Sequence, residues 1–255
     1  MPNFSTPAIL LRRINFGDYD LIITFFTLQI GKLTVIAKSA KKSTKRFFGI
    51  LELFSVLEIV VAGGGQKGLP VLQEAALKQP FANIRADITK TGYASYWAEL
   101  IDVWLEDGVK QVDLFRLFQH VLEQLDHGNV TDAAASILFQ MRFTQLSGHS
   151  PNLRQCSVCR TPLENIETDK VLFNPKRGGL VCQNCDRRSE GHLSLSKGTV
   201  KQLLWVEKGD LTQAGRIRFT PQALNEGLQL LEAFVPYHLG KEPRSLKFLR
   251  DIRQD

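Results

Sequence analysis

All four cysteines of this 255-residue chain fall in two Cys-x-x-Cys pairs, and no cysteine is left over. The pairs are Cys156 with Cys159 and Cys182 with Cys185, and 22 residues separate them. Each such turn places two thiolates within reach of one ion, and two turns supply the four tetrahedral sulfur ligands that Zn²⁺ prefers. The spacing therefore predicts a structural Zn²⁺ site, closed to substrate, in a small ribbon.

Two other uses of these cysteines stay open on the residues alone. Two disulfides would need an oxidising compartment, and the N-terminus does not resemble a secretory signal. Redox chemistry needs a single Cys-x-x-Cys motif, whereas two occur together here. A strand-like run at 171–173 and two glycines at 178–179 lie between the pairs, as a ribbon requires. These features favour a metal.

The first eighty residues predict a small barrel. Five strand-like segments, rich in β-branched and aromatic residues, are separated by turn signals. They cover 8–14, 21–28, 33–37, 54–62 and 69–77, and Gly63, Gly64 and Gly65 mark the last of these turns. Five short strands without a long helix predict an OB-type Greek-key barrel, and an Sm-like or SH3-like barrel remains an alternative.

From Pro80 onward the hydrophobic period becomes that of helices. Apolar stripes predict helices over 84–104, 112–125, 131–146, 198–206, 220–235 and 243–252. Pro236 should bend or end the helix that precedes it. The expected fold class is a multidomain α+β protein: an OB-type β-barrel at 1–80, and an all-helical domain at 81–150 and 192–255. A Cys₄ zinc ribbon is inserted at 151–191.

Charge is distributed unevenly along the chain. Residues 1–80 hold ten Lys and Arg against five Asp and Glu, residues 81–150 five against nine, and residues 151–255 seventeen against twelve. Two basic ends, each with a balance of +5, thus flank an acidic middle with a balance of −4. This pattern indicates a polyanionic partner for the ends.

A dense basic segment directly follows the third predicted strand. Its cations are Lys38, Lys41, Lys42, Lys45 and Arg46, and two aromatic residues, Phe47 and Phe48, come next. Phosphate contacts supply sequence-independent affinity for nucleic acid, and bases can stack on aromatic rings. We expect a nucleic-acid-binding loop here; the alternative is a solvated loop whose two phenylalanines pack inward.

Smaller basic groups extend this hypothesis. Arg12 and Arg13 on the first strand can enlarge the patch, although one must face away because side chains alternate along a strand. The last predicted helix carries Arg244, Lys247, Arg250 and Arg253, and the ribbon carries Lys176, Arg177, Arg187 and Arg188. Phosphate binding and simple solvation are equally compatible with these two groups.

No catalytic or membrane-spanning motif is visible. The chain has no phosphate-cradling Gly-x-x-x-x-Gly-Lys-Ser/Thr, no dinucleotide-binding glycine pattern and no His-Glu-x-x-His. Its five histidines are scattered, and no apolar run reaches the ~20 residues of a membrane span. We therefore expect a soluble, cytoplasmic protein that is not an enzyme.

Together these features resemble the bacterial RecO family of recombination mediators, over nearly the whole chain. The motifs that carry the resemblance are Gly17-Asp18-Tyr19-Asp20-Leu21, Ala37-Lys38-Ser39-Ala40-Lys41-Lys42, Tyr96-Trp97-Ala98-Glu99-Leu100, Gly178-Gly179-Leu180-Val181 directly before Cys182, and Ser245-Leu246-Lys247-Phe248-Leu249. Ser39 stands where glycine is usual in the family. The resemblance agrees with the barrel, helical domain and ribbon expected above.

The resemblance implies a function. A RecO-like protein binds single- and double-stranded DNA, anneals complementary strands and promotes RecA loading onto protein-coated single strands in recombinational repair. The implied partners are RecR, indirectly RecA, and the acidic, hydrophobic C-terminal tail of the single-stranded DNA-binding protein; association with the nucleoid follows. Such a tail needs an apolar groove rimmed by cations, for which Lys247 and Arg250 are the candidates.

Three other functions are the alternatives to this one. A zinc-ribbon RNA-binding or transcription-associated protein would share the barrel, the charge and the ribbon. A metal-dependent enzyme would need an open coordination position, which four cysteine ligands do not leave. A structural adaptor would use its basic patches to bind acidic protein surfaces.

Overall fold

The computed structural model describes residues 3–63, 68–128, 130–186, 191–208 and 210–254. Arg187 and Arg188, and Gly64 and Gly65 of the predicted turn, lie outside the described residues. The chain divides into two compact units, one of Met1–His127 with Phe248–Asp255 and one of Gly128–Lys247. Among the described residues, no helix has both the length and the apolar character needed to cross a bilayer.

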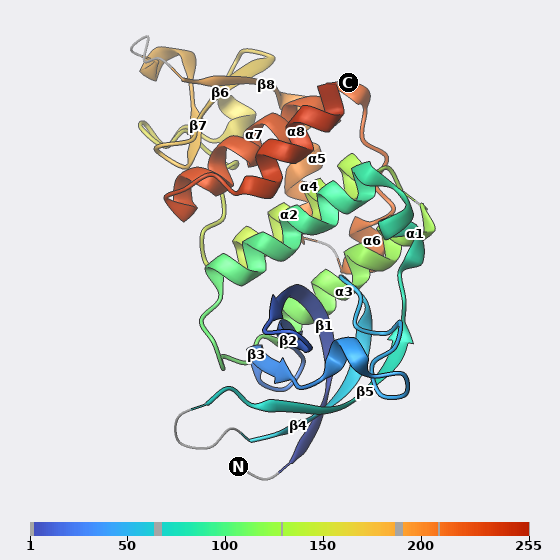
Figure 1. Cartoon of the computed structure of the whole chain (residues 1–255). Coiled ribbons are helices and arrows are strands. Elements are labelled where there is room, and N and C mark those ends of the chain that lie inside the picture. The colour runs from blue at the N-terminus through green and yellow to red at the C-terminus, as the bar shows by residue number, and fades with distance from the viewer. Residues whose placement is uncertain (1–2, 64–67, 129, 187–190, 209, 255) are drawn as a thin grey trace. The chain divides into compact units, whose positions relative to one another are not determined.

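The first unit contains a closed five-stranded barrel (Figure 1). Its strands are β1 (Phe4–Phe16), β2 (Asp20–Thr27), β3 (Gly31–Ala37), β4 (Val56–Ala62) and β5 (Val71–Gln79). Around the barrel they follow the order β1-β2-β3-β5-β4, and β3 pairs with β5 in parallel while the other pairs are antiparallel. The five predicted strands and the OB-type barrel are confirmed.

A β-bulge in β1 sets which of its side chains face the core. Leu10 pairs with Phe25 and Arg12 with Thr24, so Leu11 is the extra residue. Residues 8–11 are all buried, whereas residues 12–16 are all exposed. The bulge interrupts the ordinary alternation of a strand. It therefore separates the core half of β1 from a half whose side chains line the barrel surface.

Helices complete the first unit. They are α1 (Ala82–Ala86), α2 (Ile88–Trp104), α3 (Val112–His127) and the end of α8 (Arg244–Gln254). The Asp87 side chain caps α2 by accepting hydrogen bonds from the main-chain N–H groups of Thr89 and Lys90. Close packing of α8 on α2 depends on Gly92, where a Cβ would lie 2.9 Å from the Cδ1 atom of Ile252.

The second unit combines helices with a three-stranded sheet. The helices are α4 (Asp132–Leu146), α5 (Lys197–Lys208), α6 (Leu211–Ala214) and α7 (Pro221–Leu239). The sheet has the order β7-β6-β8, with β6 at Lys170–Asn174, β7 at Gly179–Val181 and β8 at Leu193–Ser196. It packs on α7 through Phe173 and Phe234, whose ring centroids are 5.9 Å apart. The predicted ribbon strand at 171–173 lies within β6.

Two expectations for this unit need correction. The helix predicted to end near residue 235 continues through Pro236 to Leu239. Proline removes one main-chain donor but fits helical φ, so a last turn can still form. Gly240, at φ 72°, ends the helix and donates its N–H to the Tyr237 carbonyl. Residues 193–196, expected in the helical region, instead form strand β8 beside β6.

Candidate metal centre and nucleic-acid interface

The four cysteine sulfurs form one cluster in the second unit. Each Sγ lies within 4.8 Å of the other three, and the Sγ atoms of Cys159 and Cys182 are 3.6 Å apart. Zinc–sulfur bonds of about 2.3 Å in a tetrahedron give sulfur–sulfur distances of about 3.8 Å, whereas a disulfide bond is about 2.05 Å long. The cluster could hold one metal ion, and the four cysteines are free thiols rather than disulfides.

Two tight turns bring these sulfurs together. In the first, Cys156 N–H donates to the Thr161 carbonyl and Arg160 N–H to the Cys156 carbonyl. Arg160 adopts a left-handed conformation with φ 62°, which turns the chain sharply. In the second, Cys185 N–H donates to the Cys182 carbonyl at 3.0 Å. A short 3₁₀ turn, η3 (Gln183–Cys185), thus forms the second knuckle.

Hydrogen bonds around the sulfurs suit a metal site. The main-chain N–H groups of Val158 and Cys182 point at the buried Sγ of Cys156, at 3.5 and 3.4 Å. The Thr161 hydroxyl lowers the pKa of Cys159 to about 6, while the hydrogen bond with Cys159 raises the pKa of Cys185 to about 12. The cysteines thus share protons unequally. A divalent cation bound by all four sulfurs would remove this difference, because it favours the thiolate form of every ligand.

The predicted basic loop lies on the surface of the barrel between β3 and β4. It includes a 3₁₀ turn, η1 (Ala40–Lys42), and its cations are all exposed. These cations are Lys38, Lys41, Lys42, Lys45 and Arg46. Within the described part of the chain none of them forms an ion pair with a carboxylate. Their charges are therefore available to an anionic partner.

Local contacts give this loop a defined conformation. Ser39 adopts a left-handed conformation with φ 54°, and its N–H donates to the Asp20 carboxylate at 2.7 Å. The Nζ of Lys42 lies 3.3 Å from the ring centroid of Tyr19, a cation–π contact. Arg46 donates to the Lys38 carbonyl at 3.3 Å. Contacts with Tyr19 and Asp20, at the turn between β1 and β2, thus hold the loop in this conformation.

The two phenylalanines of the loop have different environments. Phe47 packs in the barrel core with 4% of its surface exposed, together with Leu51 and Phe25. Phe48 is 77% exposed. The inward packing that the alternative expected is therefore observed for Phe47 and not for Phe48, whose ring is exposed to solvent.

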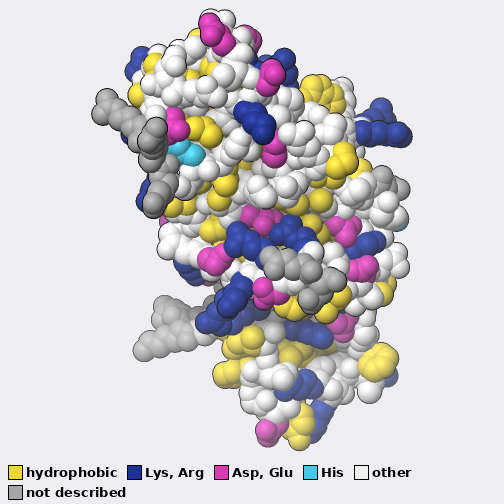
Figure 2. All heavy atoms as spheres, turned by 90° about the horizontal axis from the view of Figure 1, so that it is seen from above, with side chains coloured by type: hydrophobic (Ala, Val, Ile, Leu, Met, Phe, Trp, Pro, Cys, Tyr) yellow, Lys and Arg dark blue, Asp and Glu magenta, His cyan; other side chains and the backbone are white. Residues whose placement is uncertain are grey.

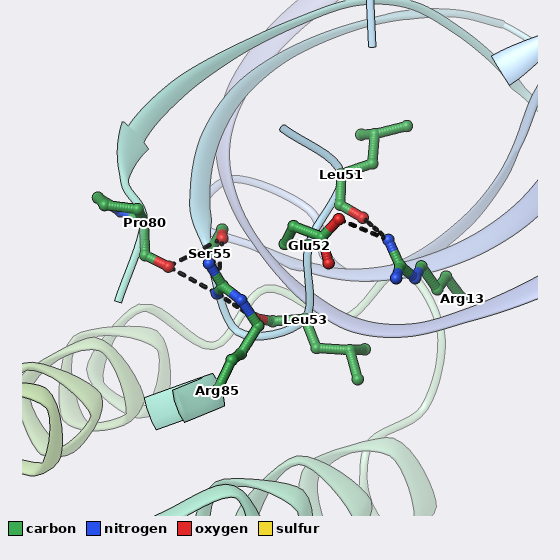
Figure 3. Close-up of polar contacts among 7 residues, drawn as sticks. All are labelled: Arg13, Leu51, Glu52, Leu53, Ser55, Pro80 and Arg85. Carbon is green, nitrogen blue, oxygen red and sulfur yellow. Dashed lines mark hydrogen bonds and ion pairs between the residues drawn. The ribbon is translucent and has the colours of Figure 1, made fainter. Parts of the chain in front are cut away.

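Arg12 and Arg13 point to different places, as strand alternation requires. The Nη1 of Arg13 donates to the Leu51 carbonyl at 2.6 Å and lies 3.1 Å from Glu52, at the base of the basic loop (Figure 3). Arg12 lines a separate hollow of about 230 Å³ with Lys32. The structure brings Arg13, not Arg12, next to the loop.

A second arginine, which no sequence pattern pointed to, binds the residues that lead from the basic loop into β4. Arg85, from α1, donates to the carbonyls of Leu53 and Pro80 and approaches the Ser55 hydroxyl (Figure 3). Buried Phe54, between Leu53 and Ser55 in the chain, adopts a left-handed conformation with φ 68°. No sequence motif indicates this role, because the acceptors are main-chain oxygens brought close by the fold.

The remaining candidates lie outside the barrel strands. On α8, Lys247 is exposed and Arg250 half-buried, while Leu246 and Leu249 are buried, as the helical pattern predicts. Their role in partner binding stays a prediction. On the face drawn in Figure 2, Lys and Arg side chains lie in several small groups with Asp and Glu nearby. Net charge alone would not have located a binding surface.

Comparisons with known proteins identify the family. Residues 1–81 match the family model described as "Recombination protein O N terminal", and residues 85–247 match "Recombination protein O C terminal". A DNA repair protein RecO from Desulfatibacillum aliphaticivorans is 49% identical over 100% of this chain and 99% of its own length. One from Desulfosudis oleivorans is 45% identical, over 99% of both chains. One from Syntrophus aciditrophicus is 32% identical, over 98% of this chain and 96% of its own. The chain therefore belongs to the RecO family of DNA repair proteins.

Proposed function

We propose that this chain is a non-enzymatic recombination mediator. It binds single- and double-stranded DNA, anneals complementary strands and promotes RecA loading onto protein-coated single strands. Its partners are RecR and the C-terminal tail of the single-stranded DNA-binding protein, with Lys247 and Arg250 as contacts for that tail. The proposal places it in the cytoplasm at the nucleoid.

One observation carries the DNA-binding part of this proposal. Five exposed cations lie within nine residues, 38–46, on one loop of the barrel, and none pairs with a carboxylate of the residues that the structure describes. Their charges neutralise phosphates and release counterions, which drives binding of any DNA sequence. Neutralising two strands at once lowers their mutual repulsion, so complementary bases can pair without ATP.

We also propose that the metal is Zn²⁺, held by Cys156, Cys159, Cys182 and Cys185. Four sulfur atoms close enough together to coordinate one ion tetrahedrally are the ligand set that zinc prefers. They leave no open coordination position for catalysis. Zinc would therefore supply folding energy to the ribbon and no reaction step.

The test is strand annealing together with the salt dependence of DNA binding. Replacing Lys41, Lys42, Lys45 and Arg46 with alanine should slow annealing and reduce the slope of log K against log salt. Loss of four phosphate contacts lowers that slope by about 3 for single strands and slightly more for duplex. A matched control replaces four other exposed cations, namely Lys78, Lys110, Arg116 and Lys201. An unchanged slope in the loop variant would place the DNA site elsewhere.

A further inference from the structure

A groove of about 680 Å³ opens beside the basic loop, entirely within the barrel unit. Side chains from β1 and from the loop line it, among them Arg13, Asn15, Lys41, Phe48 and Glu52. Pockets for small ligands span about 300 to 1,000 Å³, so this groove has room for a nucleoside. The exposed lining of the groove is mostly polar and includes the cations of Arg13 and Lys41, which suits part of a nucleic acid rather than an apolar peptide.

Phe48 gives the groove a flat apolar surface. It is 77% exposed, whereas the adjacent Phe47 fills the barrel core. The Phe48 ring therefore adds little to core packing, and its face is accessible for stacking with a base. Every base has a π face, so stacking on such a ring is tolerant of sequence and strengthens binding about fivefold or more for each base. Lys41 lines the same groove, within reach of the phosphate chain attached to a stacked base.

The other lining groups offer hydrogen bonds of both kinds. Arg13 and Glu52 form an ion pair at 3.1 Å, and the Leu51 carbonyl fixes the guanidinium further, so both are held in place (Figure 3). Asn15 also lines the groove, and its side-chain amide has no hydrogen-bond partner among the described residues. An amide and a carboxylate can satisfy the donors and acceptors on the edge of an unpaired base.

Resting on the DNA-binding function proposed above, we infer that this groove holds one unpaired base of a single strand. The base stacks on Phe48, and its edge faces Asn15 and Glu52. In a duplex the bases are stacked and paired with each other, so this contact is lost and only the phosphate contacts of the basic loop remain. The chain therefore holds single strands more tightly than the duplex that annealing produces, and it releases that product.

The test compares three DNA probes of equal phosphate count: an oligo(dT), an abasic strand and a duplex. Phe48→Ala should weaken oligo(dT) binding at least fivefold and leave the abasic strand and the duplex within twofold of the wild type. Phe48→Trp retains a stacking ring, so it should keep the affinity, and oligo(dT) should quench its fluorescence. Asn15→Ala should weaken oligo(dT) and spare the abasic strand.

Two results would contradict the inference that the groove binds a base. One is an equal loss for all three probes with Phe48→Ala; the other is no loss for any probe. Both differ from failure of the proposed function, in which the wild-type chain itself binds none of the probes. An unchanged melting temperature of Phe48→Ala, expected for so exposed a side chain, shows that a loss of affinity does not come from unfolding.

Discussion

The Nζ of Lys32 lies 3.2 Å from a carboxylate oxygen of Asp107, and this pair joins strand β3 to the connection between α2 and α3. The same ammonium donates to the main-chain carbonyl of Asp102 at 2.6 Å. The N–H of Gly108 donates back to the Lys32 carbonyl at 3.0 Å. These contacts form a joint between the barrel and the helices of the first unit.

Replacing Lys32 with methionine should therefore destabilise the first unit. The side chain of Lys32 is only 14% exposed, and its loss leaves the carbonyl and the carboxylates without their charged donor. Hydrogen bonds to charged groups are worth about 1.5 to 3 kcal/mol, so we expect a decrease of about 2 kcal/mol in the free energy of unfolding. Urea denaturation measures it.

The matched control is Lys78→Met on β5, where the lysine is exposed. It removes the same charge from the same barrel, and we expect a change below about 0.5 kcal/mol. If both substitutions lower the free energy of unfolding equally, the loss of one positive charge accounts for the effect, and the contacts with Asp102 and Asp107 do not.

Gly31 makes the same joint sterically demanding. A Cβ at this position would lie 1.9 Å from the Val109 carbonyl oxygen, and the glycine has φ +86°. Gly31→Ala combines backbone strain of about 1 to 2 kcal/mol with a collision against main chain. We expect a loss of at least about 3 kcal/mol in the free energy of unfolding, measured by urea denaturation.

Gly17 separates the two contributions to this effect. It also has a positive φ, +55°, but no atom of the described residues lies within 4 Å of its added Cβ. Gly17→Ala should therefore cost about 1 to 2 kcal/mol, the strain alone. If Gly31→Ala costs no more than Gly17→Ala, the close approach of β3 to the connection at Val109 is not rigid.

The sequence predicts those parts of the fold that depend on local periodicity or on spacing. The five barrel strands follow from alternating β-branched residues and turn signals, and the cysteine cluster follows from two Cys-x-x-Cys pairs. Strand β8 was missed because Leu193–Ser196 is short and depends on pairing with β6. Pro236 misled the prediction, since proline disfavours a helix without always ending it.

Side-chain partners in the candidate site could not be predicted in the same way. Phe47 and Phe48 are identical neighbours in sequence, and only the path of the loop decides which one enters the core. The sequence placed Arg13 near the basic segment, but it gave no sign that the guanidinium pairs with Glu52, 39 positions further along the chain. Such long-range contacts have no signature in the local pattern of a single sequence.

Loss of one cysteine ligand should abolish the metal site and unfold the ribbon. Cys156 is buried and its sulfur accepts two main-chain hydrogen bonds, so Cys156→Ser leaves three thiolates and a weaker oxygen donor. We expect bound zinc to fall from about one per chain to near zero, as measured by atomic absorption. A lower melting temperature of the second unit should accompany it.

Val158→Ala is the control for this substitution, because Val158 is 47% exposed in the same turn and supplies only its main-chain N–H. It should retain about one zinc per chain. A Cys156→Ser variant that also retains full zinc would show that the four sulfurs do not form the site.

Glu226 of α7 holds the start of α5, and this contact should depend on pH. Its carboxylate accepts hydrogen bonds from the Ser196 N–H at 2.9 Å and from the Thr199 hydroxyl. Burial raises the pKa of Glu226, but the hydrogen bonds from Thr199, Ser196 and Gln222 outweigh it, so the pKa lies below its ordinary value of 4.5. The ionised carboxylate is therefore the form that stabilises the fold.

Glu226→Gln should lower the free energy of unfolding by about 1 kcal/mol at pH 7, comparable to the loss of a helix cap. The stabilisation by a carboxylate with a lowered pKa is complete above pH 4.5 and is lost as pH falls through the lower pKa of the folded state. The difference between wild type and Glu226→Gln should therefore stay constant from pH 7 to about pH 5 and shrink in more acidic buffer. Urea denaturation across this range measures it, with the exposed Glu167→Gln as control. A difference that does not shrink below pH 4.5 would mean that the charge of Glu226 does not hold α5.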